Sequence, residues 1–179
     1  MGVALMALET TASATRGIRP STWAWVSAVL FFGLAVAFGA TQNNDSQGAT
    51  NAVASLGIVF HLALVPVVLN APAPGWAKAA GFAWLTIDIA SNVMGIAGAS
   101  EASATFVRLV GHLPAGAWII AVSWPLDGAA RVVGTALGGW LAGYTLVAVA
   151  VPEAAFMPAI VLMLAWLPLL GRSLSQLGR

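Results

Sequence analysis

The chain has 179 residues, of which 60% are hydrophobic and 7% charged, and its formal net charge is +1. A soluble domain carries about 25% charged residues, so seven basic and six acidic residues leave too little polar surface to cover a soluble core. The near-neutral charge gives no reason to expect a nucleic-acid partner, and the absence of cysteine excludes disulfides and thiolate metal sites.

Six apolar stretches are close to the length that crosses a membrane, since a bilayer core of about 30 Å takes about 20 helical residues. They do not alternate polar and apolar residues as barrel strands do. We therefore expect an all-α, polytopic transmembrane bundle of six helices. The predicted spans are 22–40, 52–70, 79–98, 105–124, 130–150 and 155–171, between an N-terminal cytoplasmic segment 1–21 and a C-terminal cytoplasmic tail 172–179.

The connections between the spans are short and rich in Pro, Gly or polar residues, which makes consecutive helices antiparallel neighbours. The first span follows Arg16 and Arg19 and resembles the start of an export signal. Its apolar run of about 18 residues is longer than the 7–15 residues usual in a signal peptide. We expect this span to be kept as an uncleaved helix.

The basic residues indicate the orientation, because cytoplasmic loops carry an excess of Lys and Arg. With the N-terminus inside, all basic residues except Arg108 fall on the cytoplasmic side: Arg16, Arg19, Lys78, Arg131, Arg172 and Arg179. The outer connections carry Asp45, Glu101 and Glu153. Near the inner boundary, where indole rings are favoured, lie Trp23, Trp25, Trp76 and Trp124. We expect both termini in the cytoplasm and a multi-pass protein of the cell membrane, which is the cytoplasmic membrane if the source is bacterial.

Small residues on the fifth span predict close helix packing, because Gly lets helix backbones approach one another in lipid. They form two stripes, Gly134 with Gly138 and Gly139 with Gly143. The stripes fit packing inside the bundle. They also fit a contact with a second copy or with another membrane subunit, so both interpretations stay open.

Five polar or ionisable residues inside the spans are the candidates for function, because a charge at the bilayer centre costs about 2.5–3.5 kcal/mol on insertion scales. Asp88 and Asn92 are four residues apart on the third span, and Arg108 and His112 have the same spacing on the fourth. Each pair therefore shares one helix face. The hypothesis is one buried polar site between helices two, three and four, for a substrate or a proton, formed by His61, Asp88, Asn92, Arg108 and His112.

Structural roles compete with this hypothesis. Arg108 can extend to the outer interface and bind lipid headgroups or Glu101. Asp88 with Asn92 can serve as an interhelical hydrogen-bonding pair, and a lone histidine such as His61 is more often a satisfied core residue than a ligand.

Three functions remain open on the sequence. The first is a small transporter or solute-binding membrane subunit, and in size and helix count alone the chain is similar to the substrate-binding subunits of vitamin transporters. The second is a redox subunit with haem b held by His61 and His112. The third is a non-catalytic partner of a larger complex, meeting its partners within the bilayer. No Gly-x-Ser-x-Gly, His-Glu-x-x-His or phosphate-binding glycine loop occurs, so no catalytic or metal-binding residues are predicted.

Overall fold

The computed structural model describes residues 19–41 and 46–177, and within them it contains six long helices, one short 3-10 helix and no strand. The elements are α2 (Pro20–Thr41), α3 (Gln47–Asn70), α4 (Gly75–Ile96), α5 (Glu101–Ser123), α6 (Gly128–Val147), η1 (Glu153–Phe156) and α7 (Met157–Leu177). The predicted all-α class is confirmed. Five helical segments are long and apolar enough to span a membrane: α2, α3, α4, α5 and the continuous segment Ala154–Leu177.

The helix α6 differs from the other five in composition. Its 20 residues include Arg131, Tyr144 and five glycines, and it is not among the helices that are long and apolar enough to span a membrane. It begins and ends earlier than the predicted span 130–150. Its packing between α5 and α7 makes it part of the same bundle, and its crossing of the membrane stays a prediction.

The C-terminal helix is longer than predicted. The expected tail began at residue 172, but α7 continues to Leu177. Leu170 and Leu174 are both buried and four residues apart, so the apolar face of the helix extends into the expected tail. Several predicted features of the chain ends and the first loop lie outside the described residues: most of segment 1–21, Arg16, Asp45 and Arg179.

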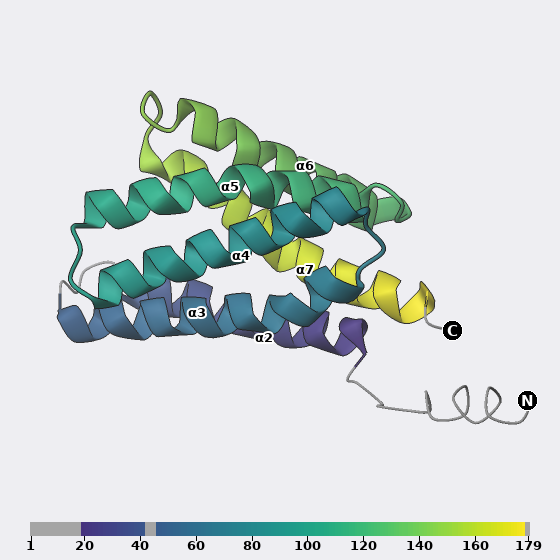
Figure 1. Ribbon diagram of the computed structural model, residues 1–179, viewed down its shortest axis with the longest axis horizontal. Helices are drawn as coiled ribbons and strands as arrows, with labels where there is room; N and C mark the ends of the chain where they lie inside the picture. Colours follow the sequence, from purple (N-terminus) through teal and green to yellow (C-terminus); the bar gives the residue numbers. More distant parts are fainter. Residues whose placement is uncertain (1–18, 42–45, 178–179) are drawn as a thin grey trace, which may run out of the picture.

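The six helices form a closed ring. Each helix packs on the helices before and after it in the sequence, and α7 packs on α2 to close the circle. Figure 1 shows the helices running along the long axis of the molecule. Short connections make neighbours antiparallel, as expected. Ser100 begins α5 by accepting a hydrogen bond from the Ser103 backbone N–H, and Gly98 supplies the left-handed backbone, with φ of +80°, that turns the chain after α4.

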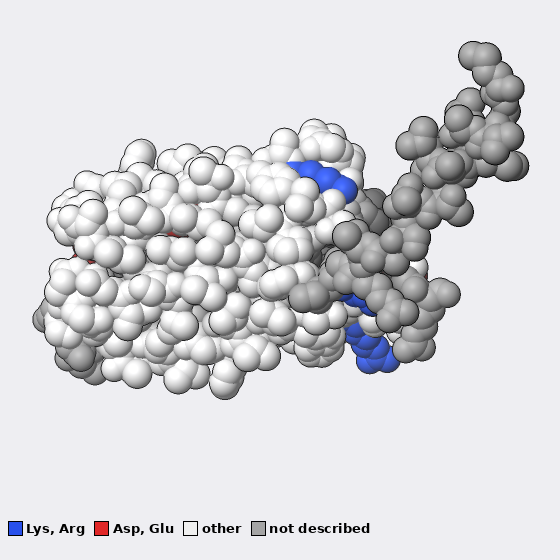
Figure 2. Space-filling view, turned by 60° about the horizontal axis from the view of Figure 1, so that its bottom comes forward, with Lys and Arg blue, Asp and Glu red and all other residues white. Residues whose placement is uncertain are grey.

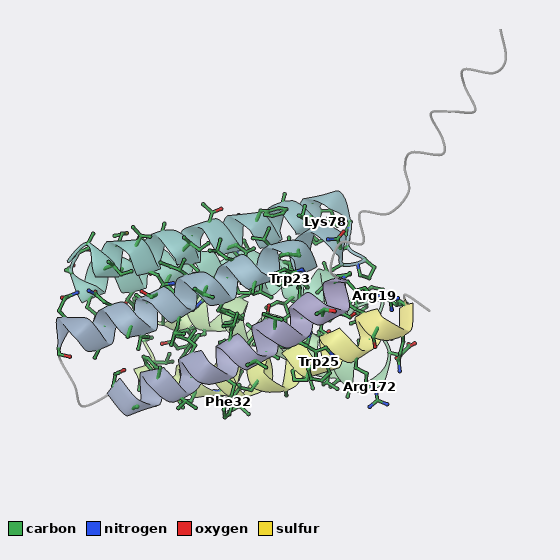
Figure 3. The ribbon with its side chains drawn as sticks, turned by 90° about the horizontal axis from the view of Figure 1, so that it is seen from below. Arg19, Trp23, Trp25, Phe32, Lys78 and Arg172 are labelled. Atoms are coloured by element: carbon green, nitrogen blue, oxygen red, sulfur yellow. The ribbon has the colours of Figure 1, made fainter. Side chains whose placement is uncertain are left out.

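The two ends of the bundle differ in charge. Arg19, Lys78 and Arg172 lie at one end, together with Trp23 and Trp25 (Figure 3). Arg131 is in the first turn of α6 and belongs to the same end, which we call the basic end. The opposite end, where α5 begins at Glu101, is called the acidic end. This placement agrees with the charge pattern from which the orientation was predicted.

The half of the bundle nearer the basic end is tightly packed. Trp118, Trp166 and Leu167 are fully buried there, and the Trp166 indole N–H donates to Ser123 Oγ at 2.9 Å. α5 and α6 touch through their backbones, since a Cβ atom built on Gly138 would lie 2.6 Å from the Gly116 carbonyl oxygen.

The two glycine stripes of α6 have different surroundings. A Cβ atom on Gly134 would overlap the Ser123 side chain, so Gly134 and Gly138 both face the inside of the bundle. Gly139 and Gly143 are exposed, and nothing lies within 4 Å of a Cβ atom built on either. The second stripe therefore takes no part in packing among the described residues, which corrects that interpretation for Gly139 and Gly143. The contact with a second copy or another subunit stays a prediction.

Candidate binding cavity

A cavity of about 500 Å³ lies inside the ring of helices, in the half nearer the acidic end. All six long helices contribute to its wall. Figure 2 shows blue Lys and Arg side chains at one end of the molecule, whereas red Asp and Glu atoms are seen only within hollows of the white surface toward the other end. The flanks of the molecule between these ends are apolar in this view.

The polar part of the wall comes from three consecutive helices, α3, α4 and α5. It contains all five residues that the sequence singled out: His61, Asp88, Asn92, Arg108 and His112. His61, Asp88, Asn92 and His112 are each less than a tenth exposed. The structure brings the five together around one cavity, and their functional role is a proposal taken up below.

Asp88 is held by two donors on the same carboxylate oxygen. The Trp84 indole N–H donates to Oδ2 at 2.8 Å, and His61 Nε2 lies 3.0 Å from the same atom. The other oxygen, Oδ1, is buried without a hydrogen-bond partner. It lies against α5 at Gly111, where a Cβ atom would be only 2.8 Å away. A glycine at this position of α5 leaves room for the carboxylate.

His61 is fixed through both of its ring nitrogens. Nδ1 lies 2.6 Å from the Gly57 carbonyl oxygen one turn earlier on α3, while Nε2 faces Asp88. A carbonyl oxygen only accepts hydrogen bonds, so Nδ1 carries a hydrogen.

Asn92 connects Asp88 with Arg108. Its Nδ2 donates to the Asp88 backbone carbonyl at 2.8 Å, and its Oδ1 accepts from Arg108 Nη2 at 3.3 Å. Arg108 is exposed at the rim of the cavity. The ion pairs within 4.0 Å among the described side chains are His61–Asp88 and Arg131–Asp127, so no described carboxylate pairs with Arg108.

His112 is placed by an aromatic contact. Its ring stacks on Phe156 of η1, with ring centroids 5.1 Å apart and planes 9° from parallel. Its Nδ1 is buried without a hydrogen-bond partner. The polar groups of the wall therefore include donors and acceptors that no described side chain satisfies.

The remaining wall is apolar and rich in aromatic rings. It comes from α2, α6, η1 and α7, and includes Phe31, Leu34, Phe38, Leu141, Tyr144, Phe156, Ile160 and Met163. A molecule in this cavity would meet polar groups on one side and apolar side chains on the other.

A layer of tryptophans closes the inner end of the cavity. Trp84 lines the cavity and packs on Trp118 with ring centroids 5.7 Å apart. Trp118 in turn meets Trp166 edge-on at 5.7 Å. Trp118 and Trp166 do not line the cavity, whereas Glu101, Val149 and Val151 at the acidic end do. The cavity therefore lies on the acidic-end side of this layer.

Several site residues were not predicted from the sequence. Trp84 and Gly57 each lie four residues before the residue they bind, so the helical i, i+4 spacing was the available signal. Gly111 and Phe156 carried no such signal, because their roles depend on which helices are neighbours across the ring.

The predicted haem site does not fit this geometry. With His61 Nδ1 on the Gly57 carbonyl oxygen, Nε2 is the nitrogen left for an axial bond to iron, and it faces Asp88 Oδ2 at 3.0 Å. No group of three or more His, Asp or Glu side chains that could hold a metal ion occurs within residues 19–41 and 46–177.

No protein-family profile, curated protein or solved structure matches the chain.

Proposed function

We propose that this protein is a small transporter or solute-binding membrane subunit, and that the cavity binds a small organic anion with an apolar body. The observation that carries the proposal is the cavity itself, about 500 Å³ with one polar and one apolar wall. Sites for small molecules occupy about 300–1,000 Å³ and combine apolar surface with a few placed polar groups.

The charges of the polar wall favour an anion. The Asp88 carboxylate has His61 as a partner at 3.0 Å, whereas the guanidinium of Arg108 has only the neutral Asn92 side chain. A guanidinium binds a carboxylate through two parallel hydrogen bonds. Glu101 lies on the same side of α5, seven residues before Arg108, a rise of about 10 Å along the helix. At this distance Glu101 does not pair with Arg108, and the guanidinium is available to a ligand.

The apolar wall favours a ligand with a ring. Phe31 packs on Phe60 with centroids 5.1 Å apart, and Phe156 packs on Tyr144 at 5.2 Å. Such rings offer both faces and edges to an aromatic group, since offset and edge-on arrangements are favourable. A carboxylate at Arg108 would leave the rest of the ligand facing these side chains.

Three matched probes test the proposal: phenylacetate, phenylacetamide and phenethylamine share one apolar body and carry an anionic, a neutral and a cationic head. We expect the purified protein to bind phenylacetate most tightly in equilibrium dialysis. Arg108→Gln should weaken this binding by about tenfold or more, because a hydrogen bond to a charged group contributes about 1.5–3 kcal/mol. Arg172→Gln, at the basic end, is the matched control and should bind as the parent does. Equal binding of all three probes, or of none, would contradict an anion site.

Uptake into proteoliposomes separates the two forms of the proposal. A transporter carries labelled phenylacetate across the bilayer, and we expect Asp88→Asn to reduce this flux. Binding without flux identifies a solute-binding subunit. Unchanged flux in Asp88→Asn would remove Asp88 from the mechanism.

A further inference from the structure

The contact between His61 and Asp88 fixes how many protons the two side chains share. Because His61 Nδ1 donates to the Gly57 carbonyl oxygen, only Nε2 remains to face Asp88 Oδ2 at 3.0 Å. Either Nε2–H donates to a carboxylate, or a protonated Asp88 donates to the lone pair of Nε2. Both arrangements place one proton between the same two atoms, and both leave the pair with no net charge.

Loss of this proton would leave two lone pairs facing each other and an uncompensated carboxylate in a buried position. Both side chains are under a tenth exposed, so water would not offset the charge. A proton held between the two side chains avoids this uncompensated charge.

A second partner for Asp88 lies on the facing helix. Oδ1 has no hydrogen-bond partner and touches α5 at Gly111. Arg108 lies three residues before Gly111, a rise of about 4.5 Å along the helix. Gly111 has no side chain that would separate Arg108 from Asp88 Oδ1. Asn92 already binds both Arg108 Nη2 and the Asp88 backbone.

The other charged or titratable groups around the pair are few among the described residues. α5 presents Arg108 and His112, with Glu101 at the acidic end, and α6 presents Tyr144. α2 and α7 line this cavity with apolar side chains only. Within residues 19–41 and 46–177, Arg108 is therefore the one permanent cation that lines the cavity with Asp88.

We propose that His61 and Asp88 together bind a single proton, and that Asp88 takes Arg108 as its partner when the proton leaves. In the proton-bound state Arg108 is free to bind an anion at the cavity rim. In the proton-released state the same guanidinium neutralises Asp88. Proton binding and anion binding at this site then favour each other. The coupling deepens the proposed function, but the proton site itself does not depend on what the cavity binds.

The experiment uses no solute, so its outcome is independent of the probe-binding test. The full chain, with histidine, aspartate and arginine isotopically labelled, is reconstituted in lipid bilayers and titrated by solid-state NMR. The chain has two histidines, so His112→Gln assigns the His61 signals, and Asp88→Asn assigns the Asp88 carboxyl.

We expect His61 Nδ1 to keep its hydrogen at every pH at which the protein stays folded. Nε2 and the Asp88 carboxyl should respond together in one single-proton step. Above that step, a dipolar contact between the Asp88 carboxyl carbon and the Arg108 guanidinium nitrogens should appear. Asp88→Asn should abolish the joint step, and Asp127→Asn, an exposed aspartate at the basic end, should retain it.

Loss of the hydrogen from Nδ1, or separate steps for His61 and Asp88, would overturn the shared proton site. Absence of the Arg108 contact after proton release would overturn the exchange of partners, as would retention of the proton throughout the folded range.

Discussion

The two halves of this bundle are built from the same six helices and differ in how their interiors are filled. Toward the basic end, Trp118, Trp166 and Leu167 are fully buried in the core. Toward the acidic end, the ring encloses about 500 Å³ and lines it with a buried acid, two histidines and an arginine. Lipid is as apolar as the core, so close packing is what holds such helices together. The half toward the acidic end encloses a cavity and also buries polar groups that are costly in a membrane. We therefore expect function in that half.

The boundary between the halves is the layer formed by Trp84 and its neighbours. Trp84 donates to Asp88 on the cavity side and packs on Trp118 on the filled side. We therefore expect substitutions to have different effects at the His61–Asp88 pair, in the packed core and at the glycine contacts of α6.

The largest effect is expected at the buried pair. His61→Leu or Asp88→Leu alone should lower the free energy of unfolding by about 3–5 kcal/mol, because each removes one member of a buried, hydrogen-bonded ion pair. The double variant should lose much less than the sum of the two. Unfolding in mixed micelles by denaturing detergent measures all three. Additive losses would mean that the two side chains do not act as a pair.

A matched pair of leucines compares the two halves directly. Leu167 is fully buried in the filled half, whereas Leu34 lines the cavity. We expect Leu167→Ala to cost about 2–5 kcal/mol, because it creates a new void. Leu34→Ala should cost less than about 1 kcal/mol, since one side of this residue already lacks packing partners. Equal losses would show that the two halves are packed alike.

A smaller contrast is expected between adjacent glycines of α6. Gly138→Ala would place its Cβ 2.6 Å from the Gly116 carbonyl oxygen and should destabilise the protein by about 1–3 kcal/mol. Gly139→Ala meets nothing within 4 Å, so its unfolding free energy should stay within about 0.5 kcal/mol of the parent. A loss in Gly139→Ala in bilayers alone would indicate a partner on that face.

Much of the fold was predictable from the sequence because helix length and apolar composition are local properties. The six helices, their antiparallel order and the separation of charge between the ends all followed from them. The end of α7 was missed because burial of Leu174 depends on neighbouring helices. The different surroundings of Gly138 and Gly139 were missed for the same reason, since only packing decides which stripe faces inward.

The sequence was enough to predict the residues of the candidate site, but not the hydrogen bonds between them. Buried Asp88, His61 and Arg108 stood out because charge is so costly in a membrane. The contacts of Asp88 could not be predicted, because they depend on which helices are neighbours in the ring. One carboxylate oxygen faces His61, and the other lies beside Gly111. Arg108, for which an interfacial role was an equal alternative, lies at the cavity rim with Asn92 as its partner.

The central claim, a cavity reached from the acidic end and sealed toward the basic end, is tested most directly by thiol labelling. The chain has no cysteine, so single cysteines report without background. Ala24 and Ala35 lie on α2, about three helical turns apart. Ala24 is fully buried in the core, and Ala35 lines the cavity. In folded protein in bilayers, Ala35→Cys should react with a charged, membrane-impermeant thiol reagent and Ala24→Cys should not react from either side. Reaction of Ala24→Cys, or a lack of reaction at Ala35→Cys, would contradict the account.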